Sequence, residues 1–272
     1  MKQFNKDASF LAKDLLGLLD ANAITKDQTS RVTSGIFDID KNIGGWQKGD
    51  LIILGSRPAV GKTALATKFA LEAAKDGFAV AFFSLEMSAE QMFTRIIAAE
   101  SGVDYSKLRK NKLTPREQYQ VVHATRSTGC LEERLIIGEG FSSVQTIQIE
   151  CEKLKKDKRL DLVIIDYLQL MGSSELDEKQ SFDEIAKNLK TMAKTLDVPV
   201  ILLSQATKIT ESQNGEALAG PFIDIADVVL HVRHAKDAEE IEVVIAKNRH
   251  GAIGNVEVRF NANTLSFSEI ES

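Results

Sequence analysis

One stretch of the chain, Leu51–Thr63 (LIILGSRPAVGKT), has the composition of a phosphate-binding loop between a strand and a helix. In such a loop, backbone N–H groups face a polyanion, Lys62 reaches the β- and γ-phosphates, and the hydroxyl of Thr63 reaches Mg²⁺. The template G-x-x-x-x-G-K-[ST] places its first glycine at Ser56, while Gly55 stands one residue early, but a small residue still allows the loop to close. A chance Gly-Lys-Thr at a loop-to-helix junction is the alternative. The residues predicted to contact the nucleotide are Ser56, Arg57, Pro58, Ala59, Val60, Gly61, Lys62, Thr63 and Ala64.

Two acidic residues follow apolar strand patterns and are candidates for the chemistry of this site. Asp166 ends the run LVIID, where a carboxylate beside a phosphate-binding loop positions Mg²⁺. The alternative is an acid that caps the next helix. Glu86 follows the strand AFFS and would point toward the ligand crevice of an open α/β fold, where it could polarise the attacking water as a general base. A solvated glutamate at the start of a helix is the alternative for Glu86.

Three further polar residues could respond to the phosphates. Gln205 ends the run ILLSQ and could hydrogen-bond the γ-phosphate or cap the next turn. Lys247 and Arg249 stand two apart on a strand pattern, so both cations lie on one face of that strand. Two cations in register suit a phosphate clamp or an arginine finger, and a solvated strand face is the alternative.

The pattern of the chain from residue 37 onward predicts the elements that would position these residues. Apolar runs without alternation, separated by helical patterns, predict an α/β fold with a mostly parallel sheet covered on both faces. The predicted central strands are 51–54, 79–84, 135–137, 162–165 and 198–203, and the predicted helices are 62–75, 88–101, 115–127, 143–156 and 180–196. Segments 228–232, 242–246 and 255–260 alternate and predict antiparallel strands at the C-terminal edge of the sheet. The polar segment 206–222 predicts a mobile loop.

Composition excludes several classes of protein. The 272 residues are 43% hydrophobic and 27% charged, which suits one large core, and no apolar run approaches the ~18 residues of a membrane span. The two cysteines form no disulfide framework and the N-terminus lacks a signal peptide, so we expect a cytoplasmic protein without a membrane partner. The net charge of −5 argues against coating DNA on the outside, but not against threading DNA through a ring. The four histidines form no ligand cluster, so Mg²⁺ is the only metal predicted.

The N-terminal residues form a separate unit in this interpretation. Residues 7–22 place five apolar residues at helical spacing and predict an amphipathic helix, packed either on its own domain or on a neighbouring subunit. The polar segment that follows predicts an extended arm. We therefore divide the chain into residues 1–29, a linker-like helix and arm, and residues 30–272, a nucleotide-binding domain.

Several longer motifs stand in one order along residues 30–268. They are SGIFDIDKNIGGWQKGDLIILGSRPAVGKTALA, FFSLEMS, DLVIIDYLQLM, LDVPVILLSQ, IADVVLHVR and VVIAKNRHGAIGNVEVRF. Together they resemble the RecA-type motor domain of the bacterial replicative DNA helicase family, DnaB. The phrases FSLEM, DYLQL and KxRxG make this resemblance more specific than the phosphate-binding loop alone.

The resemblance implies a RecA-like NTPase core and a role for each matched residue. Lys62 and Thr63 would bind the ATP phosphates and Mg²⁺, with Asp166 as the acid that holds the metal ion. Glu86 would be the catalytic base, and Gln205 would couple the γ-phosphate state to DNA-facing loops. In addition, Lys247 and Arg249 would act in trans on the nucleotide of the adjacent subunit. Because a trans finger requires an assembly, the resemblance implies a homo-hexameric ring around single-stranded DNA that unwinds duplex DNA.

Three departures from the family pattern leave a second function open. The primase-binding N-terminal domain is missing, as in a motor fragment or a short relative from a phage or mobile element. Lys208 is the only lysine or arginine between residues 206 and 232, and segment 172–184 is acidic apart from Lys179. Since phosphate contacts supply most sequence-independent DNA affinity, weak DNA binding is expected. The alternative is therefore a helicase-like ATPase that regulates or loads a host replicative helicase; a helicase loader or primase is a further possible partner.

Overall fold

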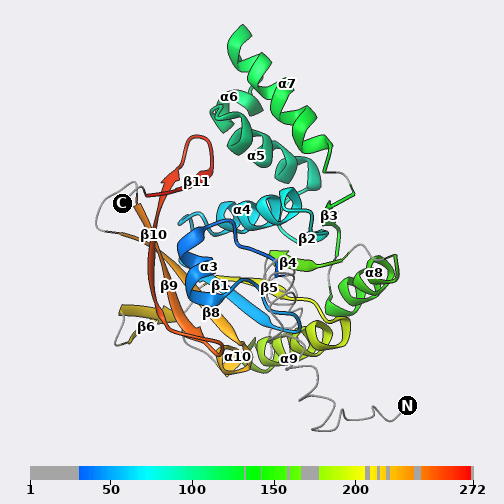
Figure 1. Cartoon of the computed structure of the whole chain (residues 1–272), viewed down its shortest axis with the longest axis vertical. Coiled ribbons are helices and arrows are strands. Elements are labelled where there is room, and N and C mark those ends of the chain that lie inside the picture. Colours follow the sequence, from blue (N-terminus) through cyan, green and yellow to red (C-terminus); the bar gives the residue numbers. More distant parts are fainter. Residues whose placement is uncertain are drawn as a thin grey trace, which may run out of the picture.

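Strands and helices alternate along most of the chain, and all described strands except β6 and β7 assemble into one twisted sheet (Figure 1). The computed structural model describes residues 31–131, 133–141, 143–157, 160–166, 178–205, 209–212, 215–218, 221–235 and 240–270. The strands of the sheet are β1 (Leu51–Ser56), β2 (Val80–Ser84), β3 (Leu135–Glu139), β4 (Leu162–Asp166), β5 (Val200–Gln205), β8 (Val228–His234), β9 (Glu240–Asn248), β10 (Gly254–Asn261) and β11 (Ser266–Glu269). All five predicted central strands are present, and the α/β prediction is confirmed.

The order of strands across the sheet is β11-β10-β9-β8-β1-β5-β4-β2-β3. In this spatial order, every pair of neighbours from β8 through β1, β5, β4 and β2 to β3 is parallel. The three pairs β8-β9, β9-β10 and β10-β11 are antiparallel. The prediction for segment 228–232 was therefore only half right, because β8 runs parallel to β1 and antiparallel to β9. Its alternation did not distinguish these cases, since a strand at the junction of the two parts has both kinds of neighbour.

Helices cover both faces of the parallel part of the sheet. They are α3 (Phe37–Ile43), α4 (Lys62–Lys75), α5 (Ala89–Ser101), α6 (Tyr105–Arg109), α7 (Pro115–Gly129), α8 (Val144–Lys156), α9 (Glu178–Leu196) and α10 (Pro221–Ile225). Side chains of α3 and α4 share one buried cluster with alternate strand residues, and side chains of α8 and α9 share another with the strand residues between them. This two-sided burial explains why the central strands are continuous apolar runs.

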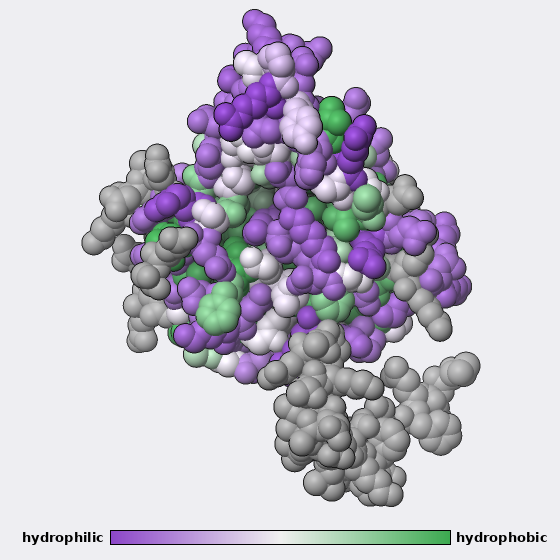
Figure 2. All heavy atoms as spheres, turned by 45° about the horizontal axis from the view of Figure 1, so that its top comes forward, coloured by the Kyte–Doolittle hydropathy of each residue, from purple (hydrophilic) through white to green (hydrophobic). Residues whose placement is uncertain are grey.

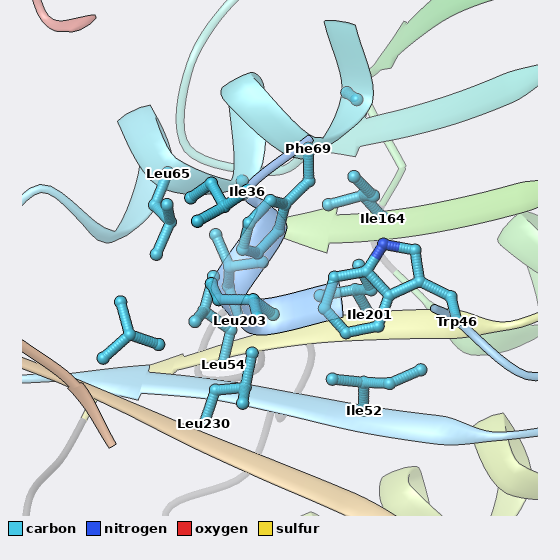
Figure 3. Packing of buried hydrophobic residues seen from close by; sticks show 14 of the residues in the cluster. Ile36, Trp46, Ile52, Leu54, Leu65, Phe69, Ile164, Ile201, Leu203 and Leu230 are labelled. Atoms are coloured by element: carbon cyan, nitrogen blue, oxygen red, sulfur yellow. The ribbon is translucent and has the colours of Figure 1, made fainter. Parts of the chain in front are cut away.

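The core on the α4 side contains the largest buried side chains. Phe69 of α4 meets Trp46 edge-on, with ring centroids 5.2 Å apart, above Ile52 and Leu54 of β1 (Figure 3). Both rings are almost fully buried, at 0% and 2% exposure. This packing holds α4 against β1, and therefore holds the loop that joins them.

Helices α5, α6 and α7 extend away from the sheet beyond α4 (Figure 1), and mostly hydrophilic residues cover the tip they form (Figure 2). Their starts follow from local sequence. Ser88 caps α5 and Thr114 caps α7, each in a reciprocal capping box, and Pro115 occupies the first turn of α7. Among the described residues, no helix is long and apolar enough to cross a membrane.

The prediction of a loop over 206–222 was wrong for its described part. Strands β6 (Ile209–Ser212) and β7 (Gly215–Leu218) pair antiparallel as a separate two-stranded sheet, and α10 begins at Pro221. The segments ITES and GEAL are short and carry no clear hydrophobic alternation, so the sequence pattern did not reveal these strands. The predicted helix over 7–22 and the unit 1–29 lie outside the described residues.

Candidate nucleotide site

The segment between β1 and α4 forms a tight loop whose shape depends on Gly61. This residue is the N-cap of α4 with φ of 98°, a conformation that favours glycine. The first turn of α4 carries no acidic residue, so its N–H groups and the positive end of the helix dipole are available to an anion. Val60 is buried and anchors the loop in the core. The local sequence thus forms a phosphate-binding loop in which no acidic side chain of the first helical turn competes with the phosphate.

Asp166 and Thr63 meet at the carboxyl edge of the sheet. The hydroxyl of Thr63 donates a hydrogen bond of 2.7 Å to Oδ2 of Asp166, and the Asp166 side chain is buried. Burial raises the pKa of the Asp166 carboxyl, although the Thr63 hydrogen bond and the nearby Lys62 ammonium oppose this. A hydroxyl and a carboxylate oxygen at this separation form a donor set that fits a hard divalent cation.

The strand register explains why these residues converge. Asp166 of β4 pairs with Ser84 of β2, and the N–H of Leu85 donates to the carbonyl of Asp166 at 2.7 Å. Glu86 is therefore brought beside Asp166, and it is exposed to solvent. Burial lowers the pKa of Lys62, while the charges of Asp166 and Glu86 raise it. On the other side, Gln205 of β5 pairs with Ser56 of β1.

These groups line one cavity of about 390 Å³. Almost all of the predicted loop residues line it, together with Glu86, Asp166 and Gln205; Val60 faces the core instead. Four lining residues were not predicted. They are Arg95, Phe260, Ala262 and Leu265.

The unpredicted residues come from two distant segments. Phe260 stacks on Phe267 at a centroid distance of 4.6 Å, and its ring lies 3.3 Å from the position that a Cβ on Gly61 would take. The end of β10 therefore forms an apolar wall beside the loop. Arg95 of α5 lies over the ring of Tyr105, and its Nε has no hydrogen-bond partner within the described structure. The only sequence signal for Arg95 was a cation inside an otherwise apolar helix face.

Lys247 and Arg249 lie elsewhere. Both contact the carbonyl of Asp224, at 2.8 Å from Lys247 Nζ and 3.2 Å from Arg249 Nη2, so the two side chains point to the same side, with Arg249 one residue beyond the end of β9. Asn248 pairs with Val228 at the start of β8, which places both cations at the amino edge of the parallel strands. The nucleotide loop is at the opposite end of β1, about 20 Å away for six residues of strand. The chain therefore does not bring this pair to its own cavity.

The fold and the cavity define a phosphate-loop NTPase core: a loop from strand to helix, an acid at the end of β4, and a glutamate just after β2, the strand beside β4. The family model for the DnaB-like helicase C terminal domain matches residues 31–269. The chain belongs to this family.

Individual relatives agree with this assignment. The chain is 35% identical over 260 residues to the replicative DNA helicase DnaB of Geobacillus stearothermophilus, covering 88% of this chain and 57% of that protein. It is 32% identical over 266 residues to the replicative DNA helicase DnaC of Bacillus subtilis strain 168, covering 90% and 58%. The chain thus spans less than two thirds of the length of these curated relatives.

Solved structures support the fold. A solved ATPase domain superposes with a TM-score of 0.85 at 23% identity, covering 98% of this chain and all of that one. A DnaB-like replicative helicase, solved in a study of its interactions with primase, superposes with a TM-score of 0.83 at 22% identity, covering 99% of this chain and 68% of that chain. The prediction of a RecA-like core of the DnaB type is confirmed.

Proposed function

We propose that this chain is an ATP-hydrolysing motor that assembles into a homo-hexameric ring, translocates on single-stranded DNA and unwinds duplex DNA. The observation that carries the proposal is the division of the catalytic set between two edges of one sheet. Lys62, Thr63, Glu86 and Asp166 surround the cavity at the carboxyl edge, whereas Arg249 lies at the amino edge. A second copy that presents its amino edge would complete the site.

Each residue has a role that its position supports. The ammonium of Lys62 and the N–H groups of the loop bind the phosphates of ATP. Thr63 and Asp166 would hold Mg²⁺, which neutralises charge on the phosphates when bound. Glu86 orients the attacking water and accepts its proton, since its carboxylate borders the cavity and faces solvent. Gln205 lines the same cavity, where its amide can contact the γ-phosphate and transmit that contact to the segment that follows.

Arg249 would act on the cavity of the neighbouring copy. A guanidinium stabilises the charge that develops on the phosphoryl group in the transition state, and such a finger accelerates turnover by about 10³- to 10⁵-fold. Lys247 lies beside it and supplies a second cation. The side chain of Arg249 is 49% exposed, so part of its guanidinium faces outward. Contact between the amino edge of one copy and the carboxyl edge of the next is a head-to-tail arrangement. Such an arrangement closes into a ring when the rotation between successive copies allows closure.

The ATPase rate with and without single-stranded DNA, at low and physiological salt, tests this function. Lys62→Ala is expected to abolish turnover, and Lys68→Ala is the matched control because Lys68 stands on the same helix and pairs with Glu72 at 3.2 Å. Arg249→Ala should abolish turnover but preserve nucleotide binding. Hydrolysis retained by Lys62→Ala would refute the site, and lost nucleotide binding in Arg249→Ala would refute the trans role.

The response to DNA separates the motor from the alternative function. Stimulation by single-stranded DNA supports translocation. A turnover that depends on Lys62 but ignores DNA favours a helicase-like ATPase that regulates or loads a resident replicative helicase. The scarcity of cations between residues 206 and 232 is the observation that favours this alternative. A pulldown with the resident helicase would then identify the partner.

A further inference from the structure

A buried carboxylate at the amino edge of the sheet contacts the proposed finger. We propose that Asp227 is a positioning residue for Arg249, and that it connects this finger rigidly to β1, whose other end carries the nucleotide loop of the same subunit. The inference rests on the function proposed above and deepens it, because it assigns a residue that relates one nucleotide site to the next.

Three hydrogen bonds attach Arg249 to its surroundings. Its Nη1 donates to Oδ1 of Asp227 at 2.9 Å, and its backbone N–H donates to the carbonyl of Asp227 at 3.0 Å. Its Nη2 donates to the carbonyl of Asp224 at 3.2 Å. A guanidinium has five N–H donors in a fixed fork, so these contacts hold one edge of it and leave further donors for a phosphate.

The second oxygen of Asp227 faces the interior and contacts β1. Its Oδ2 accepts a hydrogen bond of 2.8 Å from the N–H of Leu51, and the N–H of Asp227 donates to the carbonyl of Leu51 at 2.9 Å. The same Oδ2 accepts a hydrogen bond from Lys190 of α9. Asp227 is only 4% exposed, so this network is shielded from water.

The charge state of Asp227 suits this role. Burial is the largest single influence and would raise the pKa of its carboxyl. The hydrogen bonds from Lys190 and the N–H of Leu51, together with the charges of Lys190 and Arg249, outweigh burial and hold that pKa below its usual range. Asp227 is therefore ionised at neutral pH and forms a charge-assisted hydrogen bond with Arg249. A long, flexible side chain is thus ordered before any phosphate arrives, which is the condition for efficient electrostatic stabilisation of a transition state.

Strand β1 links the nucleotide loop of a subunit to the Arg249 finger of the same subunit. All six residues of β1 are buried, and the strand pairs with β5 and β8 along its length. A packed strand moves as a unit, so a shift of the loop after Ser56 is transmitted to Leu51 and, through Asp227, to Arg249. The nucleotide state of one subunit would then change the position of the finger that it presents to the next.

The test is the ATPase rate of Asp227→Asn in the assembled full chain. We expect kcat to fall about 10- to 100-fold, because a displacement of about 1 Å costs this much, while the affinity of the subunit for ATP changes less than about twofold. Asp224→Asn is the matched control, since that side chain is exposed and only its carbonyl contacts Arg249. Unchanged kcat in Asp227→Asn would overturn the proposal.

A further measurement, complementation in mixed assemblies, separates positioning from a structural role. A double variant with Arg249→Ala would not do so, because that change is itself expected to abolish turnover. Mixing Asp227→Asn chains with Lys62→Ala chains should give more turnover than either alone, because the second supplies intact fingers to the intact sites of the first. No rescue in the mixture, where Arg249→Ala is rescued, would refute positioning.

Asp227→Glu covers the case in which the asparagine variant fails to fold. Glutamate keeps the charge and shifts the carboxylate by one methylene, so we expect the same selective loss of kcat, and wild-type kcat would overturn the proposal. Failure of the proposed function looks different. A wild-type chain without ATPase activity, or a fully active Arg249→Ala, refutes the trans finger itself, whereas an inactive Arg249→Ala with an active Asp227→Asn refutes only the positioning role.

Discussion

Replacing Gly61 by alanine should damage the nucleotide loop through two separable effects. The first is conformational, because Gly61 has φ of 98° and a side chain in this left-handed region costs about 1–2 kcal/mol. The second is steric, because the new Cβ would lie 3.3 Å from Cε1 and Cζ of Phe260 and 3.4 Å from Cζ of Phe267. Those rings stack on each other, so the loop rather than the wall has to move.

Gly77 offers a closely matched control for the first effect. Its φ is 99°, and no atom lies within 4 Å of the position that its Cβ would take. Gly77→Ala should therefore lower the free energy of unfolding by about 1–2 kcal/mol, which lowers Tm by about 2–8 °C, and the variant should retain full ATPase activity. Gly61→Ala should lower the free energy of unfolding by the same amount or more. Its kcat/KM for ATP should fall about 3- to 10-fold, because the contact requires a shift of a few tenths of an ångström and a misplacement of about 1 Å costs about 100-fold.

Thermal unfolding and ATPase assays on the two variants test whether the contact with Phe260 constrains the nucleotide loop. Equal losses of stability together with full turnover in Gly61→Ala would show that the contact with Phe260 does not constrain the loop. A large loss of turnover in Gly77→Ala would show instead that the assay reports general destabilisation.

Two other predictions concern the buried acid and the core. Because burial raises the pKa of Asp166, the folded chain keeps that proton to a higher pH than the unfolded chain, and the contribution of Asp166 to the stability of the Mg²⁺-free protein falls as pH rises above about 4. The free energy of unfolding of Asp166→Asn, measured relative to wild type by urea titration, should therefore increase over that window, and an opposite slope would contradict the pKa direction. Phe69→Ala should cost about 3–5 kcal/mol because the side chain is 0% exposed, whereas Phe37→Ala at 67% exposure should change stability by less than about 0.5 kcal/mol; similar values in urea melts would contradict the core assignment.

Local pattern was sufficient to predict most of the fold. The helix over 62–75 has the bounds of α4, because its start follows from Gly61 and its apolar face from residues such as Phe69. The central strands were recognisable because burial on both faces requires continuous apolar runs. The strands of 209–212 and 215–218 were missed, since short polar strands lack that signature.

The candidate site was predictable to the extent that its residues follow strand ends. Asp166 and Glu86 both terminate apolar runs, and the parallel register of β2 and β4 brings them to one edge. Phe260 and Arg95 could not be predicted, because their positions depend on how β10 and α5 pack beside the loop. Nothing local distinguishes a strand residue that lines a cavity from one that faces the core.

The sequence by itself determined the class of the protein, because a phosphate-binding loop, its acids and the ordered motifs are local features whose chemistry depends on residue type and spacing. Only the tertiary structure decided which residues share a site. Residue type and motif make Arg249 a candidate for the nucleotide site, yet the antiparallel pairing of β9 with β8 places it at the opposite edge of the sheet, against Asp227. Long-range strand pairing sets such distances, and pairing direction is a property of the assembled sheet rather than of any one segment.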